Sequence, residues 1–518
     1  MYIKYYDSGG HKYAKLMEAK RDHNGQRYDK HLTHLGRVIS KAEGVYKNRE
    51  RGVFRFTIDG GYSDVENTNA YMKLAYGDSV ELILDFGPEY AIIETLKKNG
   101  LYDVFTSSAP SNPDTLIALI LHKMLFHEAG QYAENFWKAS YARIALPNAK
   151  LKSQRISEYL SELGDERIYR KFFHTYLGYV INKTMTTKHS IIIDSSGMQN
   201  DSHMELTAVT VHNGVKSNGS RLILAVDRKC RFPLYFRYAK GNILDVNTLT
   251  GTIEDLERYG IKVDHCIIDA GYYCGDNIED LNFAKIPYLL RLKAGNLIYD
   301  GLIAKQLDGL DTYEHRVIYG KRVVFIKCVP IELHGGEAFA YVAIDLDAQA
   351  EGRRRIYLKN VNEFVSLEER DKSLKECGVF VLISKIQVGV DEVLPLYYSR
   401  QAIEQIFDFE KNYGNLLPLR IHNEATFRGH LMVSFMATVA IMAIDSIFMS
   451  AHPKAKKKTP LNFIHARSCL RQMKCHVYED QISVSEPDRQ SNEVLDALKI
   501  GYSRIIPITS SIINFNGG

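Results

Sequence analysis

The chain has 518 residues, of which 45% are hydrophobic and 25% charged, and its formal net charge is +4. This is the composition of a globular protein, which excludes collagen-like, low-complexity and wholly disordered chains. At roughly 100 to 200 residues per domain, the length predicts two to four domains. The most apolar stretch, Leu431 to Ile444, is shorter than the roughly 20 residues of a membrane span and predicts a buried helix. Met1 to Lys30 lack the apolar core of a signal peptide, so we expect a cytoplasmic protein.

The cysteines indicate neither a disulfide framework nor a zinc site. Seven cysteines are spread through the chain, and none forms a C-x-x-C pair. An odd, scattered set predicts free thiols. The two groups nearest to a metal cluster are His265, Cys266 and Cys274, and Cys469, Cys475 and His476. Neither has the paired spacing of a zinc site.

The charge is unevenly distributed. Residues 1–60 carry 13 Lys/Arg and 7 Asp/Glu, a local charge of +6, so the remaining 458 residues carry −2. A second basic stretch, Ser446 to Tyr478, has seven Lys/Arg and no acid. Basic ends on a neutral body favour binding to a polyanion, because each Lys or Arg set against a phosphate releases counterions. Solvated surface charge explains either stretch alone at least as well.

The first half of the chain reads as a hairpin followed by helices. Residues 11–37 predict two strands around Asp22 to Gly25, where Asn-Gly suits a tight turn. From Glu89 to about Ile181, apolar residues recur at helical spacing. Ser153 is a candidate N-cap for a helix that, with the segment after Asp165, could form a helix-turn-helix.

After Lys188 the pattern becomes that of an α/β protein. Two apolar runs end in an acid: Ile191 to Ile193 precede Asp194, and Cys266 to Ile268 precede Asp269. Such runs predict buried strands whose last residue emerges at the sheet edge, so the two carboxylates would lie close together. Residues 296–386 then predict a β-rich insertion, and the chain returns to helix at Pro395.

A helix from Leu396 would carry a stripe of four polar residues. They are Tyr397, Arg400, Glu404 and Lys411, at offsets 0, 3, 7 and 14. At about 3.6 residues per turn they fall within a stripe roughly 60° wide. Neighbouring apolar residues predict that the stripe faces the core, and a carboxylate between two cations would stay ionised. On this helix alone, an ordinary ion pair between Arg400 and Glu404 is an equally good explanation.

The spacing Tyr397-x2-Arg400-x3-Glu404-x6-Lys411 resembles the Y-(2)-R-(3)-E-(6)-K signature of bacterial insertion-sequence transposases of the DDE superfamily. The run that ends in Asp194-Ser195-Ser196 is similar to that family's first-Asp strand. Asp269-Ala270-Gly271-Tyr272 is similar to its second-Asp motif. Tyr288 to Lys293 and Arg428-Gly429-His430 are also family-like, so that the resemblance spans about Ser190 to Asp445.

The resemblance implies an RNase H-like catalytic core of α/β class that is interrupted by the β-rich insertion. It implies that Asp194, Asp269 and Glu404 are catalytic and hold two Mg²⁺ ions, for which Mn²⁺ could substitute. Tyr397, Arg400, Lys411, Arg291 and Lys293 would contact DNA. The implied partners are double-stranded DNA, at transposon ends and target, and a second copy of the chain in a synaptic complex. The protein would work in the bacterial cytoplasm at the nucleoid.

The expected domain organisation follows these patterns. It comprises a basic hairpin region (1–60), a helical DNA-binding region (61–185), the first part of the core (186–295), the β-rich insertion (296–386), the second part of the core with the Glu helix (387–445), and a basic C-terminal region with a possible role in dimerisation (446–518).

Two details depart from the pattern of the family. Relatives that cut through a hairpin intermediate stack a flipped base on an aromatic residue, often a Trp of the insertion. The single Trp here, Trp137, lies in the helical region and not in the insertion. Tyr299 or Tyr313 could take the place of that Trp, and the sequence leaves open whether cleavage passes through a hairpin. Asp264 and Asp276 compete with Asp269, but Asp264 should lie at the wrong end of its strand and Asp276 should be solvated or cap a helix.

Three functions fit the sequence. The first is an active cut-and-paste transposase that binds terminal inverted repeats. The second is a catalytically silent DNA-binding or regulatory relative, against which the intact trio of acids argues. The third is a metal-dependent nuclease of the same fold. The Y-R-E-K stripe favours an end-specific transposase over this nuclease. Fold analogy alone does not separate them.

Overall fold

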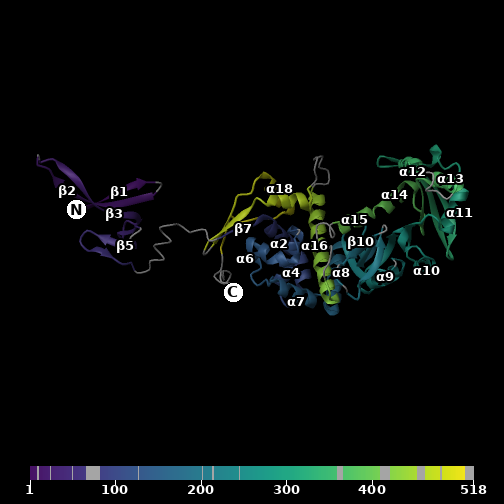
Figure 1. Cartoon of the computed structure of the whole chain (residues 1–518), viewed down its shortest axis with the longest axis horizontal. Coiled ribbons are helices and arrows are strands. Elements are labelled where there is room, and N and C mark those ends of the chain that lie inside the picture. The colour runs from purple at the N-terminus through teal and green to yellow at the C-terminus, as the bar shows by residue number, and fades with distance from the viewer. Residues whose placement is uncertain are drawn as a thin grey trace. The chain divides into compact units, whose positions relative to one another are not determined.

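The computed structural model describes residues 1–8, 11–23, 25–48, 51–65, 82–126, 128–200, 202, 204–212, 215–243, 245–358, 366–408, 421–451, 461–478 and 481–507. The chain folds as two compact units. The first unit comprises residues 1–84, 473–486 and 502–518, and the second comprises residues 85–472 and 487–501. Figure 1 labels their helices and strands.

The first unit is built from antiparallel strands. A six-stranded meander contains β1 (Tyr2–Ser8), β2 (His11–Arg21), β3 (Arg27–Ser40), β4 (Val45–Asn48), β5 (Gly52–Thr57) and β6 (Gly61–Ser63). The predicted hairpin is confirmed, since Arg21 pairs with Arg27 across the turn. One face of the sheet packs into a core of Ala14, Leu16, Leu35, Tyr46, Phe54 and Phe56. A four-stranded sheet in the order β20-β19-β18-β7 contains β7 (Leu82–Asp85), β18 (Lys474–Val477), β19 (Gln481–Val484) and β20 (Ile505–Pro507).

The second unit begins with helices. They are α2 (Gly87–Asn99), α3 (Leu101–Thr106), α4 (Pro113–Leu125), η1 (Gly130–Tyr132), α5 (Ala133–Ala139), α6 (Ala142–Ala145), α7 (Ser153–Leu163) and α8 (Glu166–Thr184). The helical pattern predicted from Glu89 is therefore confirmed. Within the region expected to be helical from residue 61, the described residues Gly61–Ser63 and Leu82–Asp85 form β6 and β7 instead. Ser153 is the first residue of α7 and not its N-cap, which is Lys152.

A ten-stranded sheet follows, in the order β11-β10-β8-β12-β13-β17-β16-β15-β14, with β9 beside β10. Its strands are β8 (Lys188–Gln199), β9 (Ala208–His212), β10 (Val215–Asp227), β11 (Pro233–Lys240), β12 (Lys262–Ile268), β13 (Tyr288–Arg291), β14 (Arg316–Tyr319), β15 (Arg322–Leu333), β16 (Gly336–Asp345) and β17 (Val379–Ser384). The connecting helices are η2 (Asp245–Thr248), α9 (Leu249–Arg258), η3 (Ala270–Tyr272), α10 (Gly275–Phe283), α11 (Leu297–Gln306), η4 (Tyr313–His315), α12 (Leu346–Leu358) and α13 (Leu367–Glu376).

The first five strands of this sheet form the expected α/β core. β10 is antiparallel to both β8 and β11, whereas β12 runs parallel to β8 on its other side and β13 runs parallel to β12. This order, with α9 before β12 and α10 before β13, agrees with the expectation of an RNase H-like core. Ile191, Ile192 and Ile193 are fully buried, as a central strand covered on both faces requires.

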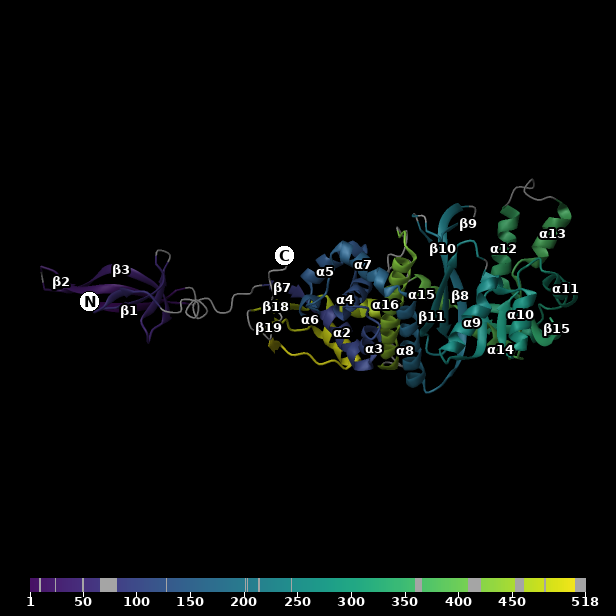
Figure 2. The ribbon, with the colours of Figure 1, turned by 90° about the horizontal axis from the view of Figure 1, so that it is seen from below.

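Residues 296–386, expected to form a β-rich insertion, contain both strands and helices. The strands predicted there are present as β14 to β17, but β17 pairs with β13, so these strands extend the core sheet. The segment also contains α11, α12 and α13, which the sequence analysis did not predict. α12 and α13 lie side by side and bury none of their described residues (Figure 2).

The long α16 (Glu424–Ala451) completes the second unit, together with α14 (Val390–Tyr398), α15 (Gln401–Asp408), α17 (Phe463–Leu470) and α18 (Arg489–Leu498). Among the described residues, α16 is the one helix long and apolar enough to cross a membrane, and 78% of its most apolar window is buried within the protein. The prediction of a buried helix at Leu431 to Ile444 is therefore confirmed. α7 approaches α16 closely, since a Cβ added at Gly429 would lie 1.9 Å from the Leu160 carbonyl oxygen.

Candidate active site

Two carboxylates converge because their strands are parallel neighbours. β8 and β12 pair up to Ile193 and Ile268, and the next residue in each strand is Asp194 and Asp269 respectively. Asp269 follows the last residue of β12, as predicted. Asp194 is not the end of its strand, because β8 continues to Gln199 by antiparallel pairing with β10 after its parallel partner has ended.

The predicted helix of the Y-R-E-K stripe is interrupted. α14 ends at Tyr398 and α15 begins at Gln401, so that Arg400 lies in the turn between them. Two short-range backbone bonds tighten this turn: the Arg400 N–H donates to the Tyr397 carbonyl over 3.2 Å, and the Ile403 N–H donates to the Arg400 carbonyl over 2.9 Å. Ile403 and Ile406 are buried, which confirms that α15 faces the core. Lys411 lies outside the described residues.

Arg400 joins all three predicted catalytic acids. Its Nη1 atom donates to Asp269 Oδ1 over 2.7 Å, and its Nη2 atom donates to Asp194 Oδ2 over 3.2 Å. Nη2 also lies 3.3 Å from Glu404 Oε1. The side chains of Arg400 and Asp194 are only 16% and 13% exposed, whereas those of Asp269 and Glu404 are 39% and 55% exposed. The cluster is therefore open to solvent on the side of Asp269 and Glu404. Acids from β8, β12 and α15 thus share one cation.

The electrostatics of this cluster favour the charged guanidinium. Burial alone lowers the pKa of Arg400, but the neighbouring Asp194 and Asp269 raise that pKa above its ordinary value. Burial raises the pKa of Tyr397, whose hydroxyl lies 3.4 Å from Arg400 Nη1. Arg400 therefore stays protonated, and Tyr397 stays neutral as a hydrogen-bonding partner.

The donor set suits a divalent cation, but Arg400 lies among the donors. Carboxylate oxygens are the hard ligands that Mg²⁺ prefers. In the part of the chain that the structure describes, no group of three His, Cys, Asp or Glu side chains is arranged to hold a metal ion. The three acids surround a guanidinium instead. The residue types fit Mg²⁺, and the observed arrangement requires Arg400 to move before they can bind it together.

The other predicted DNA contacts are on or near this edge. Arg291 ends β13, is exposed, and stacks on the Phe380 ring at 5.4 Å. Its charge acts on the Tyr397 hydroxyl, which places it near the cluster. Lys293 is exposed two residues further on. Arg221 of β10 was not predicted as a site residue. It donates to the Ser195 hydroxyl over 3.0 Å, beside Asp194. Its position on the strand that pairs with β8 is the feature that could have indicated it.

The competing acids lie as expected. Asp264 is within β12 but exposed, on the strand's other end from Asp269. Asp276 is exposed in the first turn of α10, and the N-cap there is Cys274. Neither contacts Arg400 in the described structure.

The aromatic candidates for base stacking differ in accessibility. Tyr299 is 2% exposed and therefore unavailable as a stacking platform, whereas Tyr313 is 77% exposed. The guanidinium of Arg316 lies 4.3 Å from the Tyr313 ring centre. Trp137 is partly buried and donates to the Leu146 carbonyl over 3.0 Å, which gives it a packing role.

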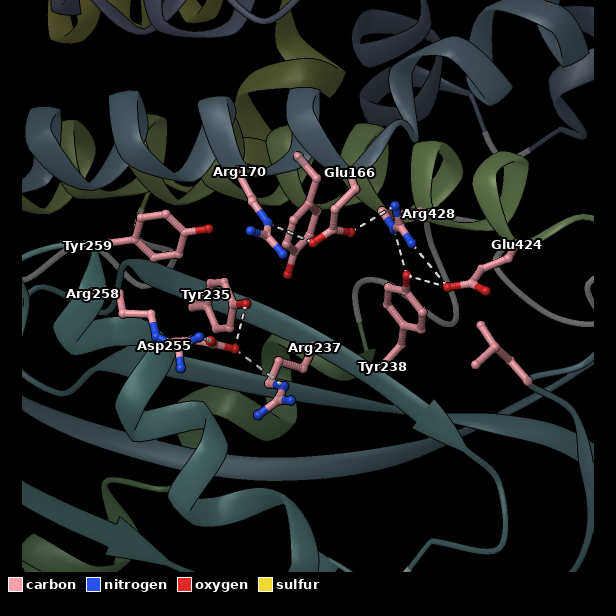
Figure 3. Close-up of a pocket in the computed structure, with 12 residues that line it drawn as sticks. Glu166, Arg170, Tyr235, Arg237, Tyr238, Asp255, Arg258, Tyr259, Glu424 and Arg428 are labelled. Atoms are coloured by element: carbon pink, nitrogen blue, oxygen red, sulfur yellow. Dashed lines mark hydrogen bonds and ion pairs between the residues drawn. The ribbon is translucent and has the colours of Figure 1, made fainter.

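A separate cavity of about 660 Å³ lies between α8, α9, β11 and the start of α16 (Figure 3). Arg428 links three elements there: it lies 2.9 Å from Glu166 and 3.0 Å from Glu424, and it donates to the Tyr238 hydroxyl. On the opposite wall, Asp255 accepts a hydrogen bond from Tyr235 over 3.0 Å and pairs with Arg258. The charges that line the cavity are paired with one another, so its contacts join the helices to the edge of the sheet.

The comparison with protein families identifies the segment that contains this cluster. Residues 186–440 match the family model described as "Transposase DDE domain". The match supports a DDE transposase function. A comparison with curated proteins gives no match.

Two solved structures are similar over much of their length. A piggyBac transposase synaptic complex with hairpin DNA has 8% identity and a TM-score of 0.38, with 79% of each chain covered. The Drosophila P element transposase strand transfer complex has 11% identity and a TM-score of 0.19, with 79% of this chain and 86% of that chain covered.

Proposed function

We propose that the protein is a DNA transposase of the bacterial insertion-sequence Y-R-E-K group that moves its element by cut and paste. The observation that carries the proposal is the convergence of Asp194, Asp269 and Glu404 on Arg400 within the transposase DDE domain. These acids come from two strands and a helix that lie far apart in the sequence, and a merely structural ion pair needs only one of them.

In this proposal the three acids bind metal and the basic residues bind DNA phosphates. Asp194, Asp269 and Glu404 would hold Mg²⁺, or Mn²⁺ in its place, and orient the scissile phosphate beside them. Bound metal would supply activation of water or a DNA 3′-hydroxyl and stabilisation of the leaving oxygen. Arg400, freed from the acids, would contact a phosphate of the transposon end, with Tyr397, Arg291, Lys293 and Lys411 beside it.

The same proposal includes the partners. The substrates would be double-stranded terminal inverted repeats and target DNA, and two copies of the chain would pair the ends in a synaptic complex. The protein would act at the nucleoid in the bacterial cytoplasm.

The proposal is tested by mapping strand breaks. Purified full-length protein and its E404Q variant are incubated with Mg²⁺ and a DNA fragment that carries the gene's own flanks. We expect breaks at matching inverted repeats with the wild type and none with the variant. DNA that is retarded but uncut by both proteins would instead indicate the catalytically silent DNA-binding relative.

A further inference from the structure

The six-stranded N-terminal sheet has two chemically different faces, which its strand register defines. Side chains alternate between the faces of a strand, and directly paired residues share a face. Ile3, Tyr5, Ala14 and Leu16 belong to the face that packs into the apolar core. Tyr6, Tyr13, Arg37 and Lys47 are consecutive partners across β1 to β4, and they form a row on the other face.

Basic side chains are gathered on that second face. By the same register it carries Lys4, Lys15, Arg21, Arg27, Arg37, Lys47 and Arg55, and none of these residues is buried. Among the strand residues of this face there is a single acid, Asp29, and it accepts a hydrogen bond from the Tyr2 hydroxyl. We name these seven Lys and Arg residues, with Tyr6 and Tyr13, the basic face.

The core face shows that this segregation is not a general excess of charge. Its strand ends carry three lysines, Lys12, Lys20 and Lys30, and two acids. Lys12 lies opposite Asp7 in the register of β1 and β2, and Lys30 lies opposite Glu18 in the register of β2 and β3. Lys20 Nζ lies 3.2 Å from Glu18 Oε2. The strand residues thus place a charge of +6 on the basic face and +1 on the core face.

The dimensions and chemistry of the basic face suit a polyanion with a regular backbone. Four strands at about 4.8 Å spacing make the central row roughly 14 Å wide, comparable with the roughly 12 Å major groove of B-DNA. Arg and Lys neutralise phosphates, and tyrosine hydroxyls donate to phosphate oxygens. The rings of Tyr6 and Tyr13 lie 5.8 Å apart, and the Lys15 ammonium lies 5.3 Å from the Tyr6 ring, so the row is ordered by its own contacts.

We propose that the basic face binds the phosphate backbone of double-stranded DNA, as a second DNA-binding surface besides the acid cluster. This inference deepens the proposed function and rests on it, since it takes DNA as the substrate. It assigns DNA contact to one face of the first unit's sheet, whereas the sequence pointed to the basic residues 1–60 in general and to the helical region.

The test compares variants of the two faces in the full-length protein. Arg37→Gln/Lys47→Gln and Lys4→Gln/Arg27→Gln remove charge from the basic face, and Lys12→Gln/Lys20→Gln is the matched control on the core face. Binding to a fluorescent duplex is measured by anisotropy in EDTA, which prevents cleavage, over ~50 to ~200 mM salt. The corresponding single strand is measured alongside.

Each basic-face variant is expected to weaken duplex binding about tenfold or more and to reduce the salt slope by about 2, one unit for each lost phosphate contact. The control should stay within about twofold of the wild type. Wild-type affinity and slope in both basic-face variants, or a loss confined to the single strand, would overturn the proposal. If the wild type does not cut DNA but the basic-face variants still lose binding as predicted, the transposase activity is refuted and the proposal that the basic face binds DNA still holds.

Discussion

Arg400 Nη1 and Asp269 Oδ1 lie 2.7 Å apart, although 131 residues separate them in the chain. The same guanidinium reaches Asp194 and Glu404, so one positive charge offsets three negative ones. Asp194 and Asp269 are held together by adjacent parallel strands and would repel each other without a cation between them. The arrangement of the acids therefore depends on a cation, which is either the guanidinium or a metal ion.

Replacing Arg400 should allow Mg²⁺ to take the place of the guanidinium among the three acids. In EDTA, R400Q is expected to lower the free energy of unfolding by about 1–3 kcal/mol, because it leaves partly buried acids unpaired, and their exposure limits the loss. Added Mg²⁺ should stabilise R400Q more than the wild type, since no guanidinium competes for the acids. Chemical denaturation with and without Mg²⁺ measures both effects.

The matched control is Arg322, which lies 2.9 Å from the buried Asp345. R322Q should also destabilise the protein, but Mg²⁺ should affect it as it affects the wild type. An identical Mg²⁺ response in R400Q and the wild type would show that Arg400 and the metal do not share a site.

The identity of the second catalytic acid can be tested against its neighbours in sequence. D269N is expected to reduce strand cleavage by about 10³-fold, because loss of a metal ligand removes several kcal/mol of transition-state stabilisation. D264N and D276N alter exposed acids outside the cluster and should cleave within about threefold of the wild type. Cleavage rates with saturating DNA and Mg²⁺ decide the matter, and a large loss in D276N alone would reassign the ligand.

The close packing of α7 against α16 leads to a prediction about stability. A Cβ at Gly429 would lie 1.9 Å from the Leu160 carbonyl oxygen, so G429A should destabilise the protein by about 1–3 kcal/mol or more by forcing α7 away from α16. Gly178, in the middle of α8, has open space around the same position. G178A should therefore be neutral or stabilising by up to about 1 kcal/mol. Thermal unfolding of both variants tests the contrast, which equal effects would contradict.

The sequence was sufficient to predict the parts of the site that local patterns encode. Apolar runs before Asp194 and Asp269 predicted the strands, and burial of Ile191 to Ile193 and of Cys266 to Ile268 confirms them. The spacing of Tyr397, Arg400 and Glu404 predicted that their side chains lie together, and the contacts of Arg400 with the other two agree with this, although a turn interrupts the predicted helix.

Other features are not contained in the local pattern of apolar residues. The extension of β8 beyond Asp194 is stabilised by β10, and the interruption between α14 and α15 comes from hydrogen bonds within one turn. α12 and α13 were missed because none of their described residues is buried, so they carry no apolar stripe. The bridging role of Arg400 needed the fold, since its partners lie on separate strands.

Buried histidines predict that acid destabilises the protein. Burial lowers the pKa of His122 to about 4 and that of His265 to about 4, from 6.5. Between the folded pKa of about 4 and the unfolded pKa of 6.5, the unfolded chain binds protons that the folded protein does not. The contribution to stability is therefore full above the unfolded pKa and falls as the pH drops, by up to about 1.4 kcal/mol per pH unit for each histidine. H122Q should flatten this dependence between pH 6.5 and about 4. H174Q, which changes an exposed side chain on α8, is the control for the substitution itself. Free energies of unfolding measured across this range in buffers of equal ionic strength test the prediction, and parallel curves for H122Q and the wild type would contradict it.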